Sequence, residues 1–136
     1  ASIGLVAPKV RKDLNFSEDF LESSSATIKK AFQAIEDGWL SNSLFLTGDN
    51  FTIADISAYV EIGQLQSIFT NVFNFENYPN INRWLDDMQK VDCHDDIHAA
   101  LYELGDISEE APPMEKIINA NKKALMVIQE KLANIN

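Results

Sequence analysis

Two histidines four positions apart, His94 and His98, have the spacing of residues that could bind a metal ion. On one helix this spacing puts both imidazoles on the same face, as in the zinc sites of metalloproteases. Three features argue against zinc. Asp95 stands where those sites have glutamate, no third ligand lies nearby in the sequence, and the pair falls near the start of a short helix. We therefore predict no metal site and interpret the pair as surface histidines near a helix N-terminus, where carboxylates are also favoured.

Cys93 lies next to His94, which raises the alternative of a thiol activated by a base. Adjacent residues on a helix do not face each other, and two aspartates follow closely, so the sequence predicts no catalytic cysteine. Because Cys93 is the only cysteine, no disulfide can form within the chain. This cysteine usage predicts a reducing, cytoplasmic location.

Two carboxylates in an apolar stretch, Asp55 and Glu61, are the candidates for acid–base chemistry, but their separation of six residues points them in different directions on a helix. Thr52 and Asp55 instead have the spacing of a helix capping box. In a capping box the threonine hydroxyl accepts a hydrogen bond from the amide of the aspartate, and the aspartate carboxylate accepts one from the amide of the threonine. Phe51 and Ile56 flank the box at the spacing of a hydrophobic staple. For Glu61 the sequence names no partner.

The length and charge of the chain limit its class. The 136 residues suffice for one domain with its own core. A net charge of −10 argues against nucleic acid and against anionic membrane surfaces as partners. No apolar run approaches the roughly 20 residues of a membrane-spanning helix.

Apolar residues recur at helical spacing in five stretches, which predicts an all-α bundle of five or six helices. Between Thr52 and Thr70 the only charged residues are Asp55 and Glu61, so this helix is expected to be buried at the centre of the bundle. In the other stretches the predicted inward residues are Leu21, Ile28, Phe32, Ile35 and Trp39; Ile81, Trp84, Leu85 and Met88; Ile97, Leu101 and Leu104; and Met114, Ile118, Leu125, Ile128 and Leu132.

Local signals set the ends of these helices. Ser17 is a predicted N-cap, Pro79 suits a first helical turn, and Gly105 is a predicted C-terminal stop. Residues 1–10 are predicted to be the last turns of a helix, with Pro8 outside it.

Three phenylalanines, Phe69, Phe73 and Phe75, alternate with polar residues before Pro79. A short strand would give this alternation, but no second strand is available to pair with it. We predict an irregular connection whose rings pack on the core or its edge, and keep a partner-binding patch as the less favoured alternative.

Two segments carry a family resemblance. Residues 45–56, FLTGDNFTIADI, resemble the "FLxG…xSIAD" signature that opens the sixth helix of the glutathione transferase C-terminal domain. Residues 78–85, YPNINRWL, resemble the "YPxxxxW" motif that follows it in that family, in the same order and at about the same separation. The stretch from Cys93 to Leu104, then Ala111-Pro112-Pro113 and a long final helix, is most similar to the theta class.

The resemblance implies that this chain is half of an enzyme. Glutathione transferases detoxify apolar electrophiles by conjugating them to the thiolate of glutathione. The glutathione site, with the activating serine of theta-like enzymes, lies on an N-terminal thioredoxin-like domain, whose strands and cis-proline turn are not found here. We therefore expect residues 1–136 to be a single helical domain, the C-terminal domain of a longer chain. Its start at Ala1, without a methionine, agrees with this expectation.

For such a domain the resemblance implies the electrophile pocket and much of the dimer contact. In the theta class the final helix folds over the pocket, and Ile118, Lys122 and Leu125 in the matching helix are the candidate wall residues. Helix packing and solvent exposure are the alternative for all three. The expected partners are the N-terminal domain, a second copy in a homodimer, and an apolar electrophile. Glutathione would be the co-substrate of the full-length enzyme, with no cofactor in this domain.

A second function remains open from the sequence. The same helical domain occurs as a non-catalytic interaction module, in the gamma subunit of translation elongation factor complexes and appended to aminoacyl-tRNA synthetases. The theta-like ending favours the enzyme, whereas the acidic charge does not discriminate between the two.

The periodicity makes a first testable prediction. Far-UV circular dichroism of the chain should show helix well above the roughly one-third of an average domain. A spectrum dominated by sheet would contradict both the fold class and the family resemblance.

Overall fold

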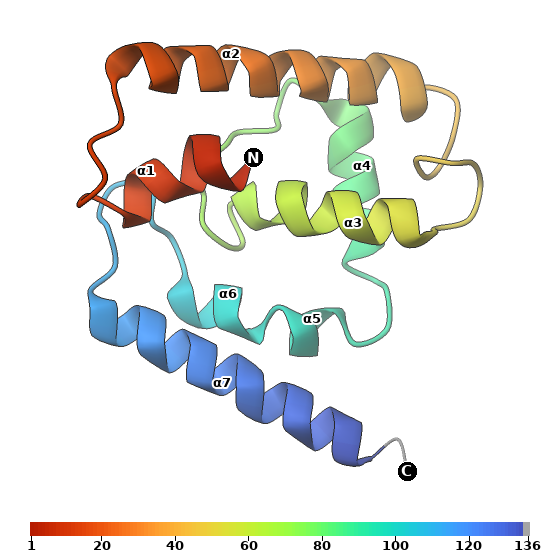
Figure 1. The fold of residues 1–136 in the computed structure, drawn as a ribbon. Helices are drawn as coiled ribbons and strands as arrows, with labels where there is room; N and C mark the ends of the chain where they lie inside the picture. The colour runs from red at the N-terminus through yellow and green to blue at the C-terminus, as the bar shows by residue number, and fades with distance from the viewer. Residues whose placement is uncertain (135–136) are drawn as a thin grey trace.

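The computed structural model describes residues 1–134 and is all-α in that range (Figure 1). Its seven α-helices are α1 (Ala7–Val10), α2 (Glu18–Ala34), α3 (Ile53–Ile62), α4 (Pro79–Met88), α5 (His94–Ile97), α6 (Ala99–Leu104) and α7 (Met114–Ala133). The chain holds α3 between α2 on one side and α5 and α6 on the other, while α7 lies along the outside of α5 and α6 (Figure 1). The predicted all-α bundle is confirmed, with the one short helix expected after residue 93 divided into α5 and α6.

The start of the chain differs from the prediction at Pro8. A π-helical turn, Ser2–Val6, runs directly into α1, and Pro8 lies inside α1 near its first turn. The prediction that Pro8 lies outside the helix is therefore wrong. The wider π turn accounts for the difference. Its last hydrogen bond runs from the amide of Ala7 to the carbonyl of Ser2. Pro8 follows at the start of α1, where the missing amide of a proline does no harm.

A side-chain hydrogen bond marks the start of helix α2, and a π-helical turn follows its end. The hydroxyl of Ser17 accepts from the amide of Phe20 at 3.2 Å, as predicted for an N-cap. At the other end a π-helical turn, Ile35–Trp39, carries the buried Glu36, whose carboxylate accepts from the amides of Asn80 and Ile81 at 2.9 and 2.8 Å. Glu36 thereby caps α4. Trp39, predicted to face inward, is 60% exposed, because the π turn rotates it away from the face of α2.

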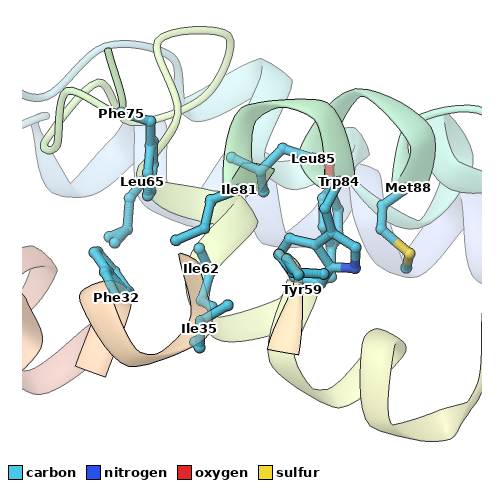
Figure 2. Packing of buried hydrophobic residues seen from close by; sticks show 11 residues of the cluster. Phe32, Ile35, Tyr59, Ile62, Leu65, Phe75, Ile81, Trp84, Leu85 and Met88 are labelled. Atoms are coloured by element: carbon cyan, nitrogen blue, oxygen red, sulfur yellow. The ribbon is translucent and has the colours of Figure 1, made fainter. Parts of the chain in front are cut away.

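The core forms where α2, α3 and α4 meet (Figure 2). The predicted inward residues of α4 are all buried, and so are Phe32 and Ile35 of α2. The buried cluster consists of Phe32, Ile35, Leu40, Tyr59, Ile62, Leu65, Phe75, Ile81, Trp84, Leu85 and Met88.

Asp55 fixes the start of α3. Its carboxylate accepts from the amide of Thr52 at 2.9 Å and from the Thr52 hydroxyl at 3.1 Å, while that hydroxyl accepts from the amide of Ala54 at 3.3 Å. The same carboxylate reaches two further segments, accepting from the amide of Leu46 at 2.8 Å and from the indole Nε1 of Trp84 at 3.0 Å. Asp55 is fully buried, so this side chain joins the turn before α3, the first turn of α3 and the middle of α4.

Helix α3 is central but not buried on every side. Tyr59 and Ile62 face the core, whereas Ile53, Ile56 and Val60 are 75%, 42% and 58% exposed. The expectation of a helix buried all round is therefore wrong for one face. The residues of α3 on this face are apolar, although no described part of the chain covers them.

The predicted irregular connection occupies residues 66–78 between α3 and α4. Phe75 is buried against Phe32, with ring centroids 5.4 Å apart, and Phe73 packs edge-on to the same ring at 4.9 Å. Phe69 is also buried, but it packs against His98 and Tyr102 instead. The phenylalanines are thus core residues, and a surface patch made of them is contradicted.

Helix α7 presents a different face to the bundle than its pattern predicts. Its least exposed residues are Ile117, Ala120, Ala124 and Val127, which share one face. The predicted inward residues Met114, Ile118, Leu125, Ile128 and Leu132 are 43–65% exposed. The helix has two apolar stripes, and the stripe with two alanines lies against α5 and α6, where small side chains allow close approach. The ion pairs Lys123–Glu103 and Lys131–Asp96, at 2.9 and 2.7 Å, join α7 to α6 and α5 in this orientation.

The multiple bonds of Asp55 generate a stability prediction. Replacing Asp55 with alanine leaves the Leu46 amide, the Thr52 amide and the Trp84 indole without their acceptor, so the free energy of unfolding should fall by about 3–5 kcal/mol. Asparagine should restore only part of the lost stability. Both oxygens of Asp55 accept hydrogen bonds, so the NH2 group of asparagine would face donors in either orientation. Urea titration of the two variants, with exposed Asp92→Ala as control, measures this. A loss of under about 1 kcal/mol for the alanine variant would contradict the assigned role.

Candidate functional site

A polar group that runs from the interior to the surface connects α3 to α5 and α6; we call it the Tyr59 cluster, comprising the buried Tyr59, Gln66 and His94 and the exposed Asp95 and Tyr102. Tyr59 Oη and His94 Nε2 are 2.8 Å apart, and His94 Nδ1 is 2.8 Å from Asp95 Oδ1. Because a carboxylate only accepts, Nδ1 carries the proton in neutral His94, and Nε2 accepts from the Tyr59 hydroxyl. Gln66 Nε2 donates to Tyr59 at 3.3 Å, and the Tyr102 hydroxyl donates to Asp95 at 2.9 Å.

The two histidines are not surface residues, which corrects the sequence interpretation. His94 is 6% exposed, and the His98 ring stacks on it with centroids 4.3 Å apart. His98 interrupts the helix between α5 and α6, and its Nδ1 donates to the carbonyl of His94 at 2.7 Å. Nothing in the spacing of residues predicts that Tyr59, 35 positions earlier, bonds to His94.

The electrostatics of the cluster disfavour a reactive tyrosine. Burial raises the pKa of Tyr59 to about 12, so its hydroxyl is protonated and acts as a donor at neutral pH. The hydrogen bond from His94, followed by that from Tyr102, lowers the pKa of Asp95 below its ordinary value. Burial lowers the pKa of His98 as well. A Tyr–His–Asp chain of this kind holds its members in fixed positions, and the raised tyrosine pKa is the opposite of what an activated nucleophile needs.

A small cavity of about 110 Å³ adjoins the Tyr59 cluster between α3, the end of α4 and α5. Its lining is almost wholly apolar, since the polar atoms of Tyr59 and His94 bond to each other. The lining residues are Ile56, Tyr59, Val60, Met88, Val91, His94, Ile97 and His98. Ile97, predicted to face inward, is instead 61% exposed at the rim, because the break at His98 ends α5 after a single turn. The cavity is therefore continuous with the exposed face of α3.

In residues 1–134 no three His, Cys, Asp or Glu side chains gather in a way that could hold a metal ion. Cys93 is exposed and sits just before α5 with a positive φ of 66°. Within the same residues no helix has the length and apolar character needed to cross a bilayer.

Glu61, left without a partner by the sequence, holds the beginning of the chain. Its carboxylate accepts from the amide and hydroxyl of Ser2 at 3.1 and 3.0 Å, and from the amino group of Ala1 at 3.0 Å. The Ser2 amide is the main reason that the pKa of Glu61 is lowered. The side chain of Glu61 thus caps the π-helical turn. Because Ser2 and Glu61 are 59 positions apart, this contact could not be predicted from residue spacing.

The candidate pocket residues Ile118, Lys122 and Leu125 lie together on the outer face of α7. Ile118 and Leu125 are 46% and 57% exposed, and Lys122 is exposed beside them. The cavity beside the Tyr59 cluster is lined by other residues. The Tyr59 cluster was not predicted from the sequence. The one signal for it is the presence of polar residues in otherwise apolar helices.

Comparison with known families identifies the fold. A family model described as "Glutathione S-transferase, C-terminal domain" matches residues 2–90, which extends from the π-helical turn through α4. The chain belongs to this family. The matched region contains the Asp55–Trp84 bond and the buried cluster between α2, α3 and α4, while α5, α6 and α7 lie beyond it. Searches among curated proteins and among solved structures gave no significant match.

The lowered pKa of His98 generates a prediction about pH. Because the unfolded chain takes up this proton at a higher pH than the folded one, the stability contribution is present above the ordinary histidine pKa of about 6.5 and is lost as the pH falls below it. The free energy of unfolding should therefore decrease from about pH 7.5 to about pH 5.5. His98→Asn, whose amide nitrogen takes the place of Nδ1 and can donate to the His94 carbonyl, should flatten this slope. If the free energy of unfolding of the variant depends on pH as in the parent protein, groups other than His98 cause the pH dependence.

Proposed function

We propose that this chain is the C-terminal helical half of a theta-like glutathione transferase, in which it forms the wall of the electrophile pocket and part of a homodimer contact. Family membership supports the general assignment. The observation that carries the proposal is that two helices, α3 and α7, each expose an apolar face. Apolar faces of this kind on a helical domain mark surfaces that meet another domain or a ligand.

The exposed face of α3 is the proposed docking surface for an N-terminal thioredoxin-like domain. Ile53, Ile56 and Val60 form one apolar strip, and the 110 Å³ cavity opens beside it. The cavity has room for about one apolar side chain, and its dry lining suits such an insertion. Docking here would also cover the rim residue Ile97.

The outer face of α7 is the proposed pocket wall. Ile118 and Leu125 offer apolar area, and Lys122 between them offers a positive charge. In this arrangement the apolar electrophile would contact the two aliphatic side chains, and glutathione would be held and activated by the other domain. The high pKa of Tyr59 agrees with this division of labour. Detoxification of apolar electrophiles in the cytoplasm is the corresponding cellular role.

The proposal predicts that activity divides along the domain boundary. The 136-residue chain alone should not conjugate glutathione to a reactive alkyl halide, and should bind ANS through its uncovered apolar faces. The longer chain that includes the preceding domain should be active. Conjugation by the isolated 136 residues would contradict the division. A longer chain inactive with every electrophile would instead favour the non-catalytic interaction module.

Substitutions on α7 test the pocket wall itself. In the active longer chain, Ile118→Ala and Leu125→Ala should change kcat/KM between two electrophiles of different size by roughly 10-fold, with little change in the KM for glutathione. Lys116→Ala is the control, because Lys116 is exposed on the same helix but lies about 160° around it from Ile118. Equal effects of all three substitutions would show that this face does not contact the electrophile.

A further inference from the structure

A polar cavity of about 450 Å³ lies on the other side of α4, between this helix and the connection that follows α3. Its volume is within the roughly 300–1,000 Å³ of small-molecule sites. One wall is formed by Asn82, Asp86 and Gln89, which repeat at i, i+4 and i+7 and so share a face of α4. The opposite wall belongs to the irregular segment and includes Ser67 and Asn71.

Hydrogen bonds within the protein fix which atoms of the α4 wall remain for a ligand. The amide nitrogen of Asn82 donates to the carbonyl of Phe75 at 2.7 Å, and that of Gln89 donates to Gln66 Oε1 at 3.0 Å. Each of these NH2 groups keeps a second N–H, and Asn82 Oδ1 and Gln89 Oε1 remain as acceptors. Together with the carboxylate of Asp86, these acceptor oxygens suit a ligand that donates hydrogen bonds.

Asp86 adds a negative charge that the protein does not neutralise. The two cations of α4, Arg83 and Lys90, both pair with Asp87, at 3.7 and 2.7 Å. Arg83 is also held by the carbonyls of Ser43 and Leu44, each at 2.9 Å. Asp86 makes no ion pair with any residue in the range 1–134. Its exposed carboxylate is thus free to bind a cation.

The opposite wall has the same preference for donors. The amide nitrogen of Asn71 donates to Asp106 at 2.8 Å, which leaves its Oδ1 as an acceptor, and the hydroxyl of Ser67 is also available. The half-buried Phe73 and the buried Phe75 also line the cavity, and the apolar surface of Phe73 suits methylene groups.

From these features we propose that this cavity binds a short aliphatic diamine. One ammonium group, with three N–H donors and no acceptor, pairs with Asp86 and the oxygens of Asn82 and Gln89. The methylene chain lies against Phe73, and the second ammonium group meets Asn71 and Ser67. The chain's net charge of −10 draws such a dication toward the protein.

The other cavity of similar volume, about 440 Å³ between the π-helical turn and α2, shows why the diamine is assigned here. That cavity also contains a carboxylate, Glu61, but the amide and hydroxyl of Ser2 already bond to it. An unpaired carboxylate beside free amide oxygens is found at the α4 cavity.

Titration of the 15N-labelled 136-residue chain with putrescine, at fixed ionic strength, tests the proposal. Saturable shifts should appear in the amide signals of residues 67–74 and 82–89. Butane-1,4-diol, which has the same length without the charges, should bind at least about 10-fold more weakly. Asp86→Asn should weaken putrescine binding by about the same factor, whereas Asp19→Asn, an exposed carboxylate on α2, should not.

Three results would overturn the proposal. Equal weakening by the Asp86 and Asp19 substitutions would mean general attraction to an acidic protein. Equal binding of the diol would mean that the cavity recognises hydroxyl groups. Shifts that do not saturate, or that lie outside the two walls, would mean that no site exists here. None of these results bears on the proposed transferase role, because α4's outer face is separate from the apolar faces of α3 and α7.

Discussion

The buried carboxylate of Asp55 is the interaction on which the arrangement of the helices depends. Four donors from three segments converge on its two oxygens, and the side chain is fully buried. Charge-assisted bonds of this kind are stronger than neutral ones, and removing the acceptor would leave several buried donors unsatisfied. The turn that presents the Leu46 amide closes between Phe45 and Gly48, where a φ of 138° requires glycine. A turn, a helix start and a neighbouring helix are thus set by one side chain.

The same device recurs at two other helix starts. Glu36 accepts from the first amides of α4, and Glu61 accepts from the beginning of the π-helical turn. In each case a carboxylate from a distant segment supplies the acceptor that an ordinary N-cap residue would supply locally, and the helix dipole favours its charge. Part of the acidity of this protein is therefore structural, because carboxylates bind its helices to one another.

Local patterns predicted the features that depend on nearby residues. The Thr52–Asp55 spacing, the Ser17 cap, Gly105 as a stop and the four inward residues of α4 follow from caps and periodicity. Long-range choices were not predictable in this way. A helix with two apolar stripes, such as α7, does not indicate which stripe meets its neighbours. The partner of His94 is 35 positions away, and that of Glu61 nearly 60, so sequence spacing carried no information about either.

The position of the Tyr59 cluster explains how the two parts of the chain are joined. Tyr59 belongs to the region matched by the family, whereas His94, Asp95 and Tyr102 belong to the segment beyond it. The cluster is therefore the polar connection between the α2–α4 core and the helices that carry α7. The apolar cavity next to it borders on the same His94 and on Val60 of the exposed face of α3. A side chain inserted into that cavity would press on α5, and the ion pair between Lys131 and Asp96 ties α5 to α7. The cavity beside α3 and the final helix α7 are thus connected through α5.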